Sequence, residues 1–228
     1  MKKLDLFLFY VMIIFLLFFS AGYILPLQKI ETSKTVFVYV NESYLHSNIS
    51  AKSIIFRGVG VSANNSSTQG EFIDVNFSLV PGFGNTYLNI KEKIYGDDFQ
   101  ESVYLIRYCA QKYTSKSLSV HDLYISMEAS VFKVYGVSST APLCIALAAL
   151  LNDKTLKNNT TMAGKLSMDG VTILPADNLQ EKIKIAESLN IQEFIVPNDQ
   201  CDLAKNTTKK LKIICVNTID EGYKHFVE

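Results

Sequence analysis

A nine-residue apolar run, Leu143 to Leu151, restricts most strongly how this chain can fold. Read as a helix it is apolar on nearly every side, so it must lie at the centre of the folded body. Small and hydroxylated residues precede it, in the stretch Tyr135 to Pro142. A helix start offers free backbone N–H groups and the positive end of the helix dipole. Ser138 therefore fits two roles, an ordinary N-cap or a nucleophile beside an oxyanion hole.

The rest of the body, taken as residues 35–228, alternates between strand and helix patterns and predicts an α/β (α+β) domain with mixed sheets and packed helices. Strands are expected at 35–40, 53–61, 71–80, 87–94, 122–127, 160–167, 171–174, 193–196 and 211–216. Further helices are expected at 97–113, 178–189, 199–205 and 218–226. A turn is expected at 64–70, and a hinge at Asp169-Gly170.

The helix expected at 178–189 carries a lysine on its apolar side. At 100° per residue one apolar arc forms, made of Leu179, Ile183, Ala186 and Leu189. Lys182 falls inside this arc, whereas Lys184 falls on the opposite side. Lys182 either extends its ammonium out along the edge of the arc, or is buried and acts as a neutral base. Asp177 and Gln180 resemble a capping box at the start of this helix.

The N-terminal segment reads as a membrane anchor. A short, mostly basic stretch (residues 1–5) precedes an uncharged apolar run from Leu6 to Leu25, followed by a linker (residues 26–34). Twenty apolar residues match the hydrocarbon thickness of a bilayer, whereas the apolar part of a cleaved signal peptide has about 7–15 residues. We therefore expect one retained transmembrane helix and a single-pass membrane protein.

Glycosylation tripeptides recur in the body, at Asn41, Asn48, Asn65, Asn76, Asn159 and Asn206. They favour an extracytoplasmic body, although a chain rich in Asn, Ser and Thr also produces them by chance. Formal net charge is +0, which gives no basic surface for nucleic acid.

Histidine and cysteine do not form a metal motif in this sequence. The three histidines, His46, His121 and His225, are scattered and none pairs with cysteine at ligand spacing. Cys109 and Cys144 lie in apolar helical patterns and read as buried small hydrophobic residues. Cys201 and Cys215 flank a polar loop, and a disulfide between them is compatible with the sequence.

From about Val80 to Val227 the chain resembles the proteolytic domain of Lon-type peptidases, which use a Ser-Lys dyad. The segment 134–147 is similar to the one that holds the family's nucleophile, with Ser138 on the nucleophile position. The segment 162–170 looks like the family's strand pair. The segment 179–182 falls on the one that carries the general base, with Lys182 on the lysine.

The resemblance implies a serine endopeptidase that cleaves peptides or unfolded protein segments through an acyl-enzyme. Ser138 would attack, Lys182 would move the proton, and Gly136, Val137 and Ser139 would surround the oxyanion. No metal or other cofactor is required. A ring of identical subunits is also implied. The 228 residues contain no segment resembling the family's ATPase domain, so short peptides and loosely folded proteins are the expected substrates.

The sequence departs from the family pattern at several supporting positions. These are Tyr135 for Asp, Val137 for Pro, Ser139-Thr140 for Ala-Gly, Ala163 for Thr, and Asp177-Asn178 for a Gly pair. They leave both dyad members in place. They also motivate an alternative, in which a catalytically degenerate domain serves as a membrane-tethered binding or assembly module.

Overall fold

The computed structural model describes residues 51–64, 67–89, 94–128, 133–134 and 137–228. The expected anchor at residues 6–25, the linker and the strand at 35–40 lie outside these residues. Within the described ranges, no helix combines the length and the apolar character needed to cross a bilayer.

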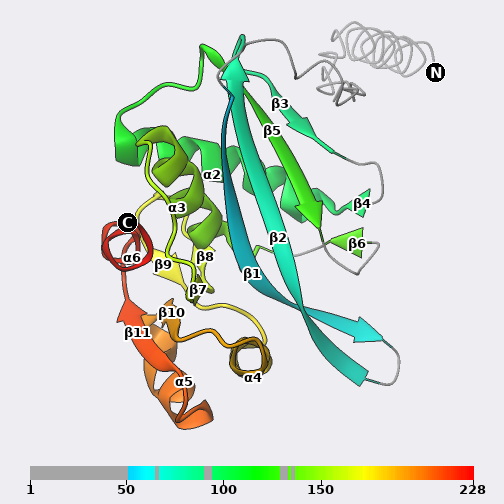
Figure 1. Cartoon of the computed structure of the whole chain (residues 1–228), viewed down its shortest axis with the longest axis vertical. Helices are drawn as coiled ribbons and strands as arrows, with labels where there is room; N and C mark the ends of the chain where they lie inside the picture. The colour runs from blue at the N-terminus through cyan, green and yellow to red at the C-terminus, as the bar shows by residue number, and fades with distance from the viewer. Residues whose placement is uncertain (1–50, 65–66, 90–93, 129–132, 135–136) are drawn as a thin grey trace, which may run out of the picture. The chain divides into compact units, whose positions relative to one another are not determined.

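The first half of the described chain forms a four-stranded sheet with the order β1-β2-β5-β3. Its strands are β1 (Lys52–Asn64), β2 (Ser67–Pro81), β3 (Thr86–Leu88) and β5 (His121–Glu128). The strands β1 and β2 form a long antiparallel hairpin, β5 runs antiparallel to β2, and β3 runs parallel to β5 (Figure 1). This mixed sheet gives the body one broad layer on which helices pack.

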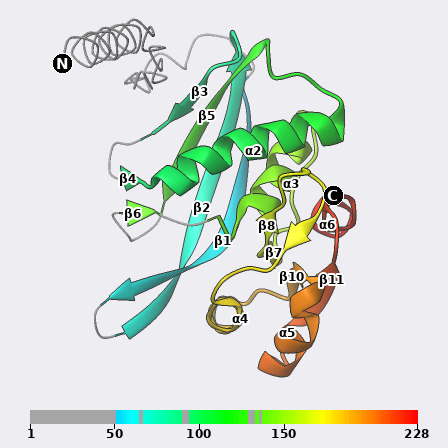
Figure 2. The same cartoon turned by 180° about the vertical axis from the view of Figure 1, so that it is seen from behind.

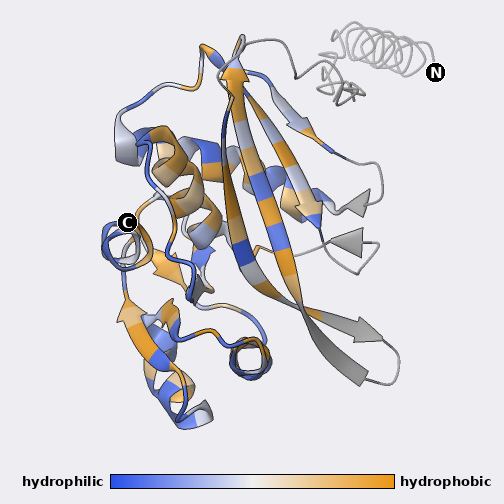
Figure 3. Cartoon of the chain, in the orientation of Figure 1, coloured by the Kyte–Doolittle hydropathy of each residue, from blue (hydrophilic) through white to orange (hydrophobic). Residues whose placement is uncertain are grey.

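Apolar and polar side chains alternate along the two long strands. On β1, Ile54 and Phe56 are buried, whereas Ile55 and Arg57 are exposed. Hydrophobic and hydrophilic bands consequently alternate along β1 and β2 in Figure 3. Side chains point to opposite faces at successive strand positions, so one face of this sheet is committed to the core.

The second half of the chain builds a parallel sheet with the order β11-β10-β7. Its strands are β7 (Thr160–Met162), β10 (Glu193–Pro197) and β11 (Lys212–Val216). Two short pairs complete the strands, parallel β4 (Ile94–Tyr95) with β6 (Lys133–Val134) and antiparallel β8 (Lys165–Leu166) with β9 (Ile173–Leu174).

Five α-helices lie in the described part of the chain. They are α2 (Asp97–Thr114), α3 (Thr140–Leu151), α4 (Leu179–Ser188), α5 (Cys201–Thr207) and α6 (Ile219–Phe226), with a 3-10 turn η2 (Asn198–Gln200) before α5. The helices α2 and α3 lie beside each other (Figure 2) and share one core with the four-stranded sheet. A second core forms beneath α4, where its apolar side meets β10 and α5.

The helix α3 is buried along its whole length, as its composition predicts. All twelve of its residues are buried, and Cys144, Ile145 and Ala146 are fully inaccessible. An apolar helix removes most surface from water when other elements surround it on every side. The segment before α3, which carries Ser138, is thereby attached to the most firmly packed element of the body.

Most predicted elements are present, with three differences. The hairpin strands extend to Asn64 and from Ser67, so the connection is shorter than the predicted turn at 64–70. Of the strand predicted at 87–94, the described residues show β3 ending at Leu88 and β4 beginning at Ile94, with residues 90–93 outside the description. The strand predicted at 160–167 is two strands in different sheets, β7 and β8, which separate at Ala163-Gly164.

Two disulfides link the helices to their neighbours. Cys201 and Cys215 join the start of α5 to β11, a pairing that the sequence left open. Cys109 and Cys144 join α2 to α3, so reading them as separate buried hydrophobic residues was wrong. Both cysteines are fully buried. The apolar helical pattern around each of them predicts burial but does not indicate that the two helices lie side by side.

Candidate active site

Ser138 lies in the turn directly before α3. The residue that caps this helix is Ser139, and its side chain makes no capping hydrogen bond. The hydroxyl of Ser138 instead receives a hydrogen bond from the Nζ of Lys182, with 2.6 Å between Oγ and Nζ. Ser138 therefore does not act as an ordinary N-cap of α3.

Lys182 reaches Ser138 from α4, one turn after the helix start. Its residue is only 4% exposed, whereas Lys184 on the opposite side of the same helix is exposed. The prediction that Lys182 faces the core is confirmed, and the alternative of an ammonium extended into solvent is excluded.

Burial changes the acid–base behaviour of this lysine. Removal from water disfavours the ammonium form and lowers the pKa of Lys182 to about 8. The Asp177 carboxylate opposes this effect by raising the pKa, and the Lys165 ammonium lowers it further. An uncharged amine is therefore accessible near neutral pH, and its lone pair can accept the hydrogen of the Ser138 hydroxyl.

A short backbone network holds the Ser138 turn. The N–H of Gly164 donates to the Ser138 carbonyl at 2.9 Å, and the N–H of Ala141 donates to the Gly164 carbonyl at 3.2 Å. A Cβ at position 164 would meet the Cγ2 of Ile173 at 2.6 Å, so only glycine permits this approach. The break between β7 and β8 thus brings a strand end against the serine.

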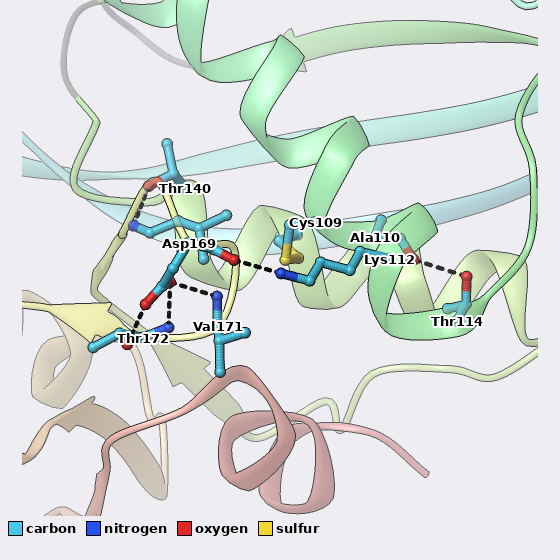
Figure 4. Close-up of a disulfide and its surroundings, with 10 residues drawn as sticks. Cys109, Ala110, Lys112, Thr114, Thr140, Asp169, Val171 and Thr172 are labelled. Atoms are coloured by element: carbon cyan, nitrogen blue, oxygen red, sulfur yellow. Dashed lines mark hydrogen bonds between the residues drawn. A yellow bond between two sulfur atoms is a disulfide. The ribbon is translucent and has the colours of Figure 1, made fainter.

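Thr140 adds a side-chain link to the same turn. Its hydroxyl donates to the Val137 carbonyl at 2.8 Å and accepts the backbone N–H of Leu166 at 2.7 Å. Figure 4 shows Thr140 beside the loop that carries Asp169, Val171 and Thr172. The sequence analysis gave Thr140 and Gly164 no such role; the isolated glycine within a strand pattern was the available signal.

The predicted oxyanion residues are partly within the described chain. The backbone N–H groups of Ser138 and Ser139 donate to no acceptor among the described residues, and they lie at the start of α3. The Val137 carbonyl is occupied by Thr140. Gly136 and Tyr135 lie outside the described residues.

The other positions near Lys182 at which the sequence departs from the expected family pattern lie in distinct environments. Ala163 is buried, and its N–H donates to the Ile195 carbonyl at 3.1 Å. Asn178 adopts the left-handed conformation, with φ 52° and ψ 39°, and is the residue that caps α4. Asparagine tolerates this conformation better than most residues, so it can stand where a glycine is usual.

The predicted capping box at Asp177 and Gln180 was wrong. No side chain caps α4, and Asp177 instead pairs with Lys165, with 2.9 Å between Nζ and Oδ2. The left-handed Asn178 begins the helix one residue later than the pattern requires, which turns Asp177 away from the helix start.

Comparison with known proteins identifies the chain. Residues 33–228 match the family of the Lon protease (S16) C-terminal proteolytic domain. The chain belongs to the Lon protease family. The expected family, with its proteolytic domain of mixed α/β fold, is thereby confirmed.

Similar proteins include Lon proteases from bacteria and archaea. The Lon protease of Phenylobacterium zucineum is 24% identical over 160 residues, which cover 67% of this chain and 20% of that protein. The archaeal Lon protease of Methanocaldococcus jannaschii is 31% identical over 105 residues, covering 46% and 16%. The aligned part of this Lon family member thus corresponds to about a fifth of the length of such relatives.

Proposed function

We propose that this chain is an active peptidase in which Ser138 is the nucleophile and Lys182 the general base. The observation that carries the proposal is the 2.6 Å contact between the Ser138 hydroxyl and a lysine that is 4% exposed. Among the described residues no carboxylate forms an ion pair with the Lys182 amine, so the charged form of this lysine would lose its hydration with little compensation. Such a costly arrangement is typical of a functional group whose pKa must be low.

The reaction follows the general course of acyl transfer. The neutral Lys182 amine accepts the hydroxyl proton while Ser138 Oγ forms a bond to the peptide carbonyl carbon. The oxyanion is stabilised by N–H groups at the start of α3, around Ser138 and Ser139. The Lys182 ammonium then protonates the leaving amine as the C–N bond breaks. Water, deprotonated by the same amine, hydrolyses the ester and restores Ser138.

Peptides and unfolded protein segments are the proposed substrates. Ser138 is half-buried and its partner amine is buried. A scissile carbonyl can therefore reach the hydroxyl only when it belongs to an extended, flexible segment of the substrate. We further propose that the domain works as an assembly of identical subunits. No cofactor is needed in these steps.

The body is proposed to lie outside the cytoplasm, attached to the bilayer through residues 6–25. Two disulfides support this location, because disulfides persist mainly in oxidising compartments. Digestion of the body by added protease in intact, wall-stripped cells is expected. Digestion only after lysis would contradict the location without affecting the dyad.

Cleavage of an unfolded, fluorescently labelled protein by the full chain tests the activity. Ser138→Ala and Lys182→Met are each expected to reduce kcat by at least about 1,000-fold, because each removes one half of the reacting pair. Ser188→Ala and Lys184→Met, on the outer side of α4, are matched controls expected to retain activity.

A serine-directed covalent probe separates the peptidase from the degenerate binding module. Labelling of Ser138 that increases with pH and disappears in Lys182→Met supports the peptidase. Turnover that persists in Ser138→Ala, or no labelling of the wild-type chain between pH 7 and 10, would favour the module.

A further inference from the structure

Lys165 and Asp177 lie beside the dyad and have no part in the steps above. Their side chains form an ion pair, with 2.9 Å from the Lys165 Nζ to one carboxylate oxygen and 3.0 Å to the other. The pair is partly exposed, with Lys165 at 30% and Asp177 at 67% side-chain exposure. An exposed pair of this kind contributes little to stability, so its position is the informative feature.

The pair connects the two segments that carry the dyad. Lys165 directly follows Gly164, whose N–H donates to the Ser138 carbonyl at 2.9 Å. Asp177 directly precedes Asn178, whose carbonyl accepts the Lys182 N–H at 3.1 Å. The ion pair therefore connects the segment that holds Ser138 to the segment that precedes Lys182.

The two charges also act on Lys182 in opposite directions. The Asp177 carboxylate favours the ammonium form, and the Lys165 ammonium disfavours it. The helix α4, which carries Lys182, packs against β1, β2 and α5. The other charged residues on these elements are Lys52 and Arg57 on β1, Glu71 and Asp74 on β2, Asp202 and Lys205 on α5, and Glu181, Lys184 and Glu187 on α4 itself. Arg57 and Asp74 neutralise each other in a bidentate pair.

We propose that Lys165 and Asp177 are a positioning pair, in which Lys165 neutralises the carboxylate that this chain carries at position 177 and keeps the Lys182 amine uncharged on Ser138. The inference rests on the proposed function. Asp177 places a negative charge close to the proposed base. Lys165 is the group that offsets that charge.

Substitution of each partner tests the pair through the pH dependence of kcat/KM. Lys165→Met leaves the Asp177 charge unopposed. The acidic limb of the kcat/KM profile is then expected to move to higher pH by about half to one unit. Asp177→Asn is expected to move it down by about half a unit, which raises turnover at pH 7 about three-fold. The double variant should return close to the wild-type profile, and Lys165→Arg should preserve it.

A matched pair on the surface provides the control. Lys212 and Glu193 form an ion pair with 2.6 Å between Nζ and Oε1, and their strands, β11 and β10, carry neither dyad residue. Lys212→Met and Glu193→Gln are expected to leave the profile unchanged. A merely structural role for Lys165 and Asp177 would lower kcat in both single variants with no opposite shifts, and would overturn the proposal.

Direct titration of the lysine amine makes the inference independent of turnover. In protein labelled with 13C at lysine Cε, the Lys182 signal is assigned by its loss in Lys182→Arg, and its pH midpoint is compared among the variants. Opposite shifts of this midpoint in Lys165→Met and Asp177→Asn support the pair even if cleavage is absent. Cleavage that depends on Ser138 and Lys182, combined with an unmoved midpoint, would refute the pair and leave the dyad intact.

Discussion

The hydroxyl of Thr140 accepts the backbone N–H of Leu166 at 2.7 Å, and this bond fastens the first turn of α3 to β8. The same hydroxyl donates to the Val137 carbonyl, next to Ser138. Thr140 is 3% exposed and Leu166 is also buried, so water cannot replace the acceptor of the Leu166 N–H. The Ser138 turn is therefore connected to the strand pair by this side chain in addition to the backbone hydrogen bonds of Gly164.

Replacing Thr140 by valine is expected to weaken both stability and catalysis. The buried Leu166 N–H would lose its acceptor, at a cost of about 1–3 kcal/mol in the free energy of unfolding. Displacement of the Ser138 turn is expected to lower kcat by roughly 10- to 100-fold. Peptide cleavage and thermal unfolding measure the two effects. Thr140→Ser keeps the hydroxyl and should restore most activity; a fully active valine variant would show that the bond is dispensable.

The activity of the wild-type chain is expected to increase with pH. Since the pKa of Lys182 is about 8, most of the amine is protonated at pH 6 and most is neutral at pH 9. Below pH 8, kcat/KM should fall about ten-fold per pH unit, because only the neutral amine can accept the serine proton. A series of initial rates in buffers of equal ionic strength measures this limb. A profile flat from pH 6 to 9 would argue against Lys182 as the base.

Lys182→Met is expected to stabilise the fold while it abolishes cleavage. The pKa of Lys182 is lowered in the folded protein, so the unfolded chain binds more protons between about pH 8 and 10.5. The resulting penalty on the folded state is therefore complete below pH 8 and disappears above about 10.5. Methionine removes the buried charge, and unfolding at pH 7 should require about 1–2 kcal/mol more.

Denaturant unfolding at pH 7 and pH 10.5 measures this difference. The advantage of Lys182→Met should shrink at the higher pH, whereas the exposed Lys184→Met should show no such dependence. A destabilised methionine variant at pH 7 would contradict the account.

Removing each disulfide is expected to destabilise the chain to a different degree. Cys109 and Cys144 are separated by 35 residues, whereas Cys201 and Cys215 are separated by 14. Closing the longer loop restricts the unfolded chain more, so the loss should be about 4 kcal/mol for the first pair and about 3 kcal/mol for the second. The free energies of unfolding of the two paired Cys→Ala variants give this order. Peptide mapping without reductant shows whether the wild-type disulfides are formed. Free thiols at these four positions in protein purified without reductant would remove the basis of the prediction.

The sequence predicted those features that depend on local pattern. The apolar run at 143–151 and the arc on α4 predicted two helices and placed Lys182 on the side that meets the core, because periodicity alone determines which side of a helix that is. The pattern left open whether the amine is buried, and the structure shows that it is. The nucleophile and base candidates then followed from the resemblance of their segments to Lon-type domains.

Features that depend on tertiary contact were not accessible from the pattern. The strand expected at 160–167 divides at Gly164 because the chain must pass close to Ser138 before it joins a different sheet. Cys109 and Cys144 pair because α2 and α3 lie together, which no spacing in the sequence indicates. Asp177 resembled a helix cap, but the left-handed Asn178 turns it toward Lys165.

The complete enclosure of α3 has a consequence for how this Lon family member can diversify. None of the twelve helix positions can accept a larger side chain without displacing a neighbour, so the element that supports the serine offers no freedom for adapting to new targets. Variation in cleavage preference should accumulate instead in the flanking segments, above all the exposed turn around Met168 and the entrance to α4.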